Sequence, residues 1–96
     1  MTYHVYMMSS ARHGTLYVGV TNNLARRAFE HRTKHQDSFT ARHGITRLVW
    51  YEEYERVQDA IAREKMLKKW RRDWKIRLIE EFNPLWDDLY PTLSGF

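Results

Sequence analysis

The sequence contains no cysteine, which excludes disulfides, thiolate nucleophiles and cysteine-based zinc sites. No apolar run approaches the roughly 18 residues of a membrane span, and the start has neither the basic nor the apolar region of a secretory signal. These absences predict a protein of the cytoplasm with no membrane partner. Metals with oxygen ligands, such as Mg²⁺, remain compatible with this composition.

The length suits one small domain and leaves no room for a second. A chain of 96 residues buries only roughly 60–65% of the surface that its unfolded form exposes. Hydrophobic residues make up 43% of it, with four Trp and six Tyr, which is enough for a folded core. We therefore expect one domain over residues 1–96, with its core in 2–90 and a frayed tail at 91–96.

Positive charge is concentrated in one segment of the chain. Between Arg63 and Arg77, eight basic residues stand against two acidic ones, whereas the whole chain has a net charge of only +4. Trp70 and Trp74 lie among these cations, and because cations neutralise phosphates and indoles stack on bases, the segment favours nucleic-acid binding. The alternative is a solvated helix whose tryptophans belong to the core. The predicted contacts, with one earlier arginine, are Arg26, Lys65, Lys68, Lys69, Arg71 and Arg72.

The first 21 residues predict a β-hairpin. Residues 3–9 and 15–21 are rich in β-branched and aromatic side chains, and residues 10–14 are turn material. In an antiparallel register Tyr6 lies opposite or nearly opposite Tyr17, and both phenols share the face away from the aliphatic residues. Gly19 is on that same face, and we expect it to leave the backbone open to approach.

A basic helix over residues 24–34 follows, with Thr21, Asn22 or Asn23 as its cap. Arg27 and His31 lie one turn apart on its inner face. An inward-facing arginine needs an anionic partner, which is either a carboxylate of the fold or a substrate phosphate. The spacing of His31 and His35 also matches a metal pair, but the sequence offers no third ligand.

The second half predicts a polar loop at 36–44, a strand at 47–53 and helices at 57–70 and 74–82, the last capped by Asp73. Glu64 takes a core-facing position in the first of these helices. A buried carboxylate must be paired or bound to a cation, so its partner is either Lys68, at i+4, or a metal. Asn83 ends the last helix before Pro84.

These segments resemble a known family in order and spacing. His4-Val5-Tyr6 and Tyr17-Val18-Gly19 look like the paired tripeptides of the GIY-YIG nuclease superfamily, and residues 23–31 look like its basic helix. The match continues through residues 39–44, 47–53, 60–65 and 83–86. Within the superfamily, the sequence most resembles the small stand-alone bacterial branch, whose members are predicted to be endonucleases. One departure is His4, which replaces the first glycine of the motif.

The resemblance implies an α+β fold, with a three-stranded mixed or antiparallel sheet flanked by helices, and metal-dependent hydrolysis of DNA. It assigns catalysis to Tyr6, Tyr17, Arg27, His31 and Glu64, and makes Glu64 the ligand of a single Mg²⁺ or Mn²⁺. Gly19 and Asn83 are then residues that support the site or contact phosphate.

The sequence leaves several points open. The general base is Tyr17, His31 or Tyr6, and the DNA is single-stranded, duplex or branched. An RNA substrate and a homodimer are not excluded. A nucleic-acid-binding module that kept the scaffold without turnover is the alternative function.

Overall fold

The computed structural model describes residues 1–33 and 43–93. Its elements in chain order are β1 (Tyr3–Ser9), β2 (Leu16–Thr21), α1 (Leu24–Thr33), β3 (Arg47–Tyr54), α3 (Val57–Lys69), α4 (Arg72–Phe82) and the 3₁₀ helix η1 (Tyr90–Leu93). Most of the predicted loop at 36–44 lies outside the described residues, as do Lys34, His35 and residues 94–96.

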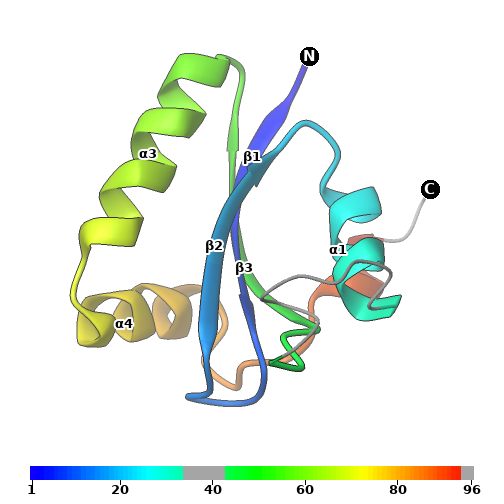
Figure 1. Ribbon diagram of the computed structural model, residues 1–96, viewed down its shortest axis with the longest axis vertical. Helices are drawn as coiled ribbons and strands as arrows, with labels where there is room; N and C mark the ends of the chain where they lie inside the picture. The colour runs from blue at the N-terminus through cyan, green and yellow to red at the C-terminus, as the bar shows by residue number, and fades with distance from the viewer. Residues whose placement is uncertain (34–42, 94–96) are drawn as a thin grey trace.

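The three strands form one antiparallel sheet in the order β2-β1-β3, which makes β2 an edge strand. Helices α3 and α4 lie on one face of this sheet, and α1 lies with η1 on the other (Figure 1). The α+β fold with a three-stranded sheet is therefore confirmed, with all pairs antiparallel. Within the described residues, no helix has both the length and the apolar character needed to cross a bilayer.

Alternating side chains of β1 supply two separate cores. Val5 and Met7 are fully buried on the α3 side, together with Val18 of β2. Tyr6 and Met8 are buried on the α1 side. Because successive strand residues point to opposite faces, the phenols are separated from the aliphatic side chains, as the sequence predicted.

The strand register differs from the predicted one. Tyr6 pairs with Gly19, and Tyr17 pairs with Met8, so the two tyrosines are diagonal neighbours with ring centroids 6.2 Å apart. A Cβ atom added to Gly19 would lie 2.5 Å from both Cζ and the hydroxyl oxygen of Tyr6. The expectation that Gly19 leaves its backbone open is therefore wrong, because the Tyr6 ring covers it.

Helix ends show two different solutions to capping. At the start of α1 the side chain of Asn23 accepts a hydrogen bond from the backbone N–H of Arg26 at 3.1 Å, as predicted. Helix α4 begins two residues before the predicted start, with Arg71 at the N-cap and no side-chain cap. Asp73 is instead engaged by Arg71, at 2.7 Å.

The chain after α4 returns to the α1 side of the sheet. There Leu89, Tyr90 and Leu93 pack against the core that contains Tyr6. The prediction that the tail frays from residue 91 is thus wrong for residues 91–93, because apolar contacts with α1 offset the cost of ordering them.

Replacing Gly19 with alanine should destabilise the protein by about 1–3 kcal/mol, because the methyl group overlaps the Tyr6 ring. Urea unfolding of the two proteins measures this loss.

The matched control is the same change in a Tyr6→Leu background, which removes the overlapping ring atoms. There Gly19→Ala should cost nothing or stabilise slightly. An equal loss in both backgrounds would show that Gly19 is needed for another reason.

Candidate active site

Four of the predicted catalytic side chains meet between α1 and the sheet. The Tyr6 hydroxyl lies 3.2 Å from Nε2 of His31 in a buried hydrogen bond. The His31 ring centroid is 5.3 Å from that of Tyr17 and 5.9 Å from that of Tyr6. Arg27 lies one helical turn before His31, and its positive charge is close enough to Tyr6 to act on the pKa of that phenol. The cluster of Tyr6, Tyr17, Arg27 and His31 is called the tyrosine cluster below.

Glu30 holds the guanidinium of Arg27 in place. Its Oε1 accepts a hydrogen bond from Nη1 of Arg27 at 2.8 Å, and its Oε2 accepts one from Nε of Arg26 at 3.2 Å. The hydrogen bond from Arg27 lowers the pKa of Glu30. The sequence analysis missed Glu30, although its i,i+3 and i,i+4 spacing to the two arginines marks it as their partner.

Burial fixes the protonation states within the tyrosine cluster. His31 is 7% exposed, and this burial, together with the charge of Arg27, lowers its pKa to about 4. Burial and the neighbouring Tyr17 raise the pKa of Tyr6 to about 12. At neutral pH the phenol of Tyr6 therefore keeps its proton, and its hydrogen bond joins it to a neutral His31 ring.

The two tyrosines differ in access to solvent. Tyr6 is 1% exposed, whereas Tyr17 is only half-buried. Tyr17 is therefore the phenol that can touch a substrate or an attacking water, and Tyr6 connects it to His31 and Arg27. Tyr6 is a positioning residue in this arrangement.

An open cavity of about 240 Å³ adjoins Arg27 at the turn between β2 and α1. Its lining residues are Thr21, Asn22, Asn23, Arg26, Arg27 and Glu30. Two guanidiniums face a single carboxylate there, so the cavity carries an excess of positive charge. A phosphate that enters it can reach a planar donor that matches its oxygens.

Glu64 reaches the sheet from the opposite side. It lies on α3, which packs against β1 and β2 on the face away from α1 (Figure 1). Its side chain is 16% exposed, and Oε2 pairs with Nζ of Lys68 at 3.1 Å. The ion-pair alternative therefore describes Glu64 in this structure. Edge strand β2 separates Glu64 from the tyrosine cluster.

A metal at Glu64 would have few protein ligands. Among the described residues, no three His, Asp or Glu side chains gather as a metal site. A single, largely shielded carboxylate nevertheless suits Mg²⁺ or Mn²⁺, since Mg²⁺ keeps several waters and takes one or two carboxylates with substrate phosphate. Glu64 thus fits a weak metal site whose other ligands are water and substrate phosphate. Metal binding would break the ion pair between Glu64 and Lys68.

Asn83 is a structural residue. It is 5% exposed, and its Nδ2 donates to the carbonyls of Val49 and Asp87 at 3.1 and 2.9 Å. Its Oδ1 accepts the backbone N–H of Asp87 at 3.1 Å. Both amide hydrogens are used within the fold, as a supporting role requires, and a contact of Asn83 with phosphate stays a prediction. The turn it holds places the buried Trp86 in a left-handed backbone conformation, with φ 58°.

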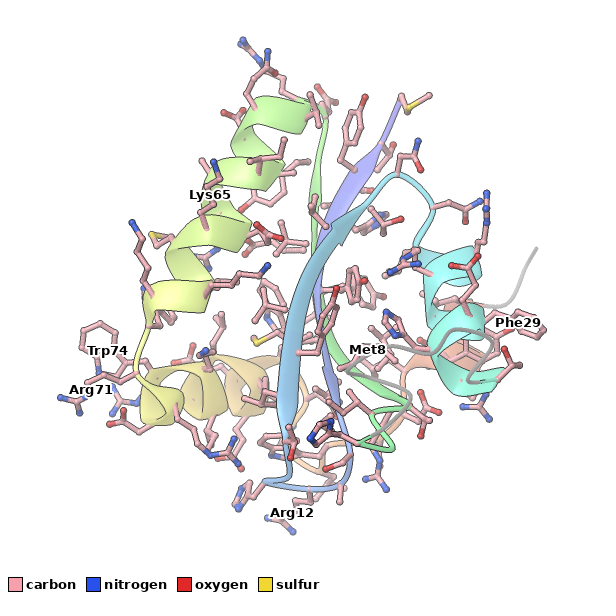
Figure 2. The ribbon with its side chains drawn as sticks, viewed as in Figure 1. Met8, Arg12, Phe29, Lys65, Arg71 and Trp74 are labelled. Atoms are coloured by element: carbon pink, nitrogen blue, oxygen red, sulfur yellow. The ribbon has the colours of Figure 1, made fainter. Side chains whose placement is uncertain are left out.

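The basic segment does not adjoin the tyrosine cluster. Lys65, Arg71 and Trp74 point outward on the side of the molecule opposite α1 (Figure 2). Arg71 pairs with Asp73 and lies 5.4 Å from the Trp74 ring, and Lys68 pairs with Glu64. Trp70 packs against the core, as the alternative for this segment proposed. Lys69 is exposed, whereas Arg72 donates to backbone carbonyls of the β1–β2 turn.

His4, which replaces the first motif glycine, packs edge-on against Tyr51 with ring centroids 5.8 Å apart. Burial lowers its pKa, and its Nδ1 is buried without a hydrogen-bond partner. The side chain therefore fills space on the same sheet face as Tyr6 in its neutral form.

The depressed pKa of His31 should make folding sensitive to acid. The unfolded chain protonates His31 below about pH 6.5 and the folded chain only below about 4, so stability falls as pH drops through this window. The loss reaches about 3 kcal/mol at most. Urea unfolding between pH 7 and pH 4 should show a smaller loss in His31→Gln, while His4 titrates in both proteins. Equal losses would contradict a buried, neutral His31.

Asn83→Ala should lower the free energy of unfolding by about 1–3 kcal/mol, because it removes a buried hydrogen bond to Val49 and two part-buried ones to Asp87. Asn83→Asp should also destabilise, since an acceptor replaces the donor to two carbonyls. Thermal or urea unfolding checks both. If both variants kept wild-type stability but bound DNA more weakly, the structural role of Asn83 would be contradicted and a contact with phosphate would be supported.

Comparison with known proteins gives one consistent result. A family model described as the GIY-YIG catalytic domain matches residues 2–77. The UPF0213 protein of Clostridium perfringens is 34% identical over 76 residues, which are 79% of this chain and 81% of that protein. A UPF0213 protein of Staphylococcus aureus is 30% identical over 81 residues, or 84% and 99% of the two chains.

The fold has a solved counterpart. The solution NMR structure of a UPF0213 protein from Bacillus halodurans aligns with a TM-score of 0.57 and 23% identity, over 99% of this chain and 98% of that one. That likeness concerns the fold alone. The family model spans most of the chain and includes the tyrosines, Arg27, His31 and Glu64. The chain therefore belongs to the GIY-YIG family, with UPF0213 proteins among its relatives.

Proposed function

We propose that this protein is an endonuclease that hydrolyses phosphodiester bonds of DNA with the help of a divalent cation. The observation that carries the proposal is the tyrosine cluster, in which a half-buried phenol lies against a buried one that hydrogen bonds to a neutral histidine and lies close to a guanidinium. Membership of the family agrees with a nucleic-acid substrate. A binding module would need cations but not this combination of groups.

Arg27 provides charge stabilisation. Its guanidinium is 30% exposed beside the open cavity, so it can hold the non-bridging oxygens of a phosphate. Glu30 and Tyr6 fix its orientation before substrate arrives. Preorganised donors of this kind stabilise the negative charge that develops in the transition state.

Tyr17 and His31 divide the role of base. A water that donates to the Tyr17 oxygen passes its proton to Tyr17 as its own oxygen bonds to phosphorus, while the Tyr17 proton moves to Tyr6 and the Tyr6 proton to Nε2 of His31. The P–O3′ bond breaks as the new bond forms, and the departing oxygen takes a proton from solvent. His31 is ready to accept because burial keeps it neutral.

Glu64 would hold the single Mg²⁺ or Mn²⁺, which when bound supplies charge neutralisation at the leaving 3′ oxygen. Lys68 lies against Glu64 and shields its charge in the absence of a cation. Substrate preference among single-stranded, duplex and branched DNA belongs to the same proposal. Because Tyr17 is half-buried, an unpaired strand, whose backbone is free to bend toward it, is the favoured substrate.

Cleavage assays with Mg²⁺ or Mn²⁺ on single-stranded, duplex and branched DNA test the proposal. Arg27→Ala should reduce the rate about 10²–10³-fold, and Glu64→Gln should do so by about 10³-fold or more. Tyr17→Phe should cost about 10²–10⁴-fold, and Tyr6→Phe should also slow cleavage, because it interrupts the proton path to His31.

The matched controls are Glu55→Gln and Arg56→Gln, two exposed residues at the start of α3 that make the same charge changes outside the site. Both should cleave like the wild type. Failure to cleave any substrate, with salt-sensitive DNA binding retained, would favour the non-catalytic module. Wild-type activity in Glu64→Gln would remove Glu64 from the mechanism.

A further inference from the structure

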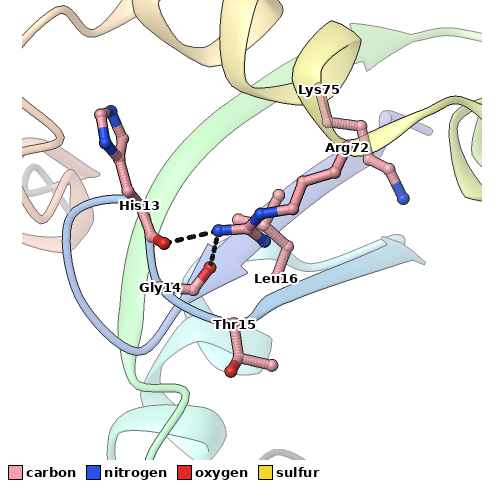
Figure 3. A pocket seen from close by; sticks show the side chains of 6 residues that line it. All are labelled: His13, Gly14, Thr15, Leu16, Arg72 and Lys75. Carbon is pink, nitrogen blue, oxygen red and sulfur yellow. Dashed lines mark hydrogen bonds between the residues drawn. The ribbon is translucent and has the colours of Figure 1, made fainter.

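A second open cavity, of about 530 Å³, lies where the β1–β2 turn meets α4. Its lining residues are His13, Gly14, Thr15, Leu16, Arg72 and Lys75. Figure 3 shows Arg72 reaching across from α4 to the turn, with Lys75 beside it. None of the lining residues is acidic, so the cavity is suited to an anion.

Arg72 builds this cavity as well as charging it. Its Nη2 donates to the carbonyl of His13 at 2.5 Å and to that of Gly14 at 2.8 Å. These two bonds fix the turn against the start of α4 and use no carboxylate. The guanidinium therefore keeps its full positive charge next to the cavity.

Lys75 supplies the second charge and has no acidic partner within the described residues. Its side chain is half-buried, and burial together with the charge of Arg72 lowers its pKa. Glu80, the carboxylate that pairs with the lining residue His13 at 2.8 Å, also accepts a hydrogen bond from the Trp86 indole at 2.9 Å. Positive charge in this cavity is therefore uncompensated.

The cavity also lies along the same edge strand as the candidate active site. Leu16 lines it and Thr21 lines the cavity beside Arg27, at the two ends of β2. At about 3.3 Å per strand residue they are about 16 Å apart, close to the rise of five nucleotides in a B-form strand. One DNA strand that follows β2 can thus reach both places.

We propose that this cavity is a second phosphate subsite, in which Lys75 and Arg72 bind a backbone phosphate of the DNA strand about four to six nucleotides from the one held by Arg27. The inference rests on the proposed function for its ligand. It also explains a cation pair that the tyrosine cluster does not use. The subsite would fix the direction in which the strand crosses Tyr17.

Binding without a divalent cation tests the subsite independently of cleavage. The affinity for a fluorescein-labelled single-stranded 12-mer, measured by anisotropy across salt concentrations, should fall about tenfold in Lys75→Gln. The slope of log K against log salt should decrease by about 0.7, the value for one lost contact with a single strand. Lys75→Arg should retain wild-type binding, and the exposed Arg56→Gln should leave the slope unchanged.

An NMR titration locates the contact. The unlabelled 12-mer should shift the backbone amides of Gly14, Thr15 and Leu16 in the wild type but not in Lys75→Gln. An unchanged salt slope in Lys75→Gln would overturn the subsite, and so would shifts caused by inorganic phosphate but not by the oligonucleotide. If the subsite signals appear while no DNA is cleaved, the subsite stands and the nuclease proposal fails.

Discussion

The site depends on the contact between the Tyr6 ring and Gly19. A side chain on the neighbouring strand would displace the ring, because a single added carbon would approach its hydroxyl to 2.5 Å. With the ring in place, the hydroxyl reaches Nε2 of His31 on α1 and joins the central strand β1 to the helix. Gly19 thus shapes the site by leaving room for the Tyr6 ring to pack against the backbone of β2.

The chemistry follows from the different environments of neighbouring groups. Burial keeps His31 neutral and Tyr6 protonated, whereas Tyr17 is only half-buried and Arg27 lines an open cavity. Glu64 approaches β2 from the other face of the sheet, where Lys68 compensates its charge. An edge strand has one side without a neighbour, so a DNA strand can pass along β2 and meet groups from both faces.

Local patterns predicted the elements well and the long-range contacts less well. Alternation along β1 was sufficient to place both phenols on one face. The strand register was not predictable, since the turn includes His13 with φ 58°. This left-handed backbone conformation is uncommon for residues other than glycine. The sequence indicated only that Asn83 ends a helix. Its side-chain amide donates to the carbonyl of Val49, 34 residues away in the chain. The position of Glu64 behind β2 follows from the topology, which spacing does not reveal.

The central claim is that residues from the two sheet faces serve one phosphate at the edge of β2. The most direct measurement is paramagnetic broadening of backbone amide signals by Mn²⁺ in the presence of uncleavable DNA. The account predicts broadening around both Glu64 on α3 and Gly19 on β2, and its loss in Glu64→Gln. Broadening centred elsewhere, or unchanged by Glu64→Gln, would contradict it.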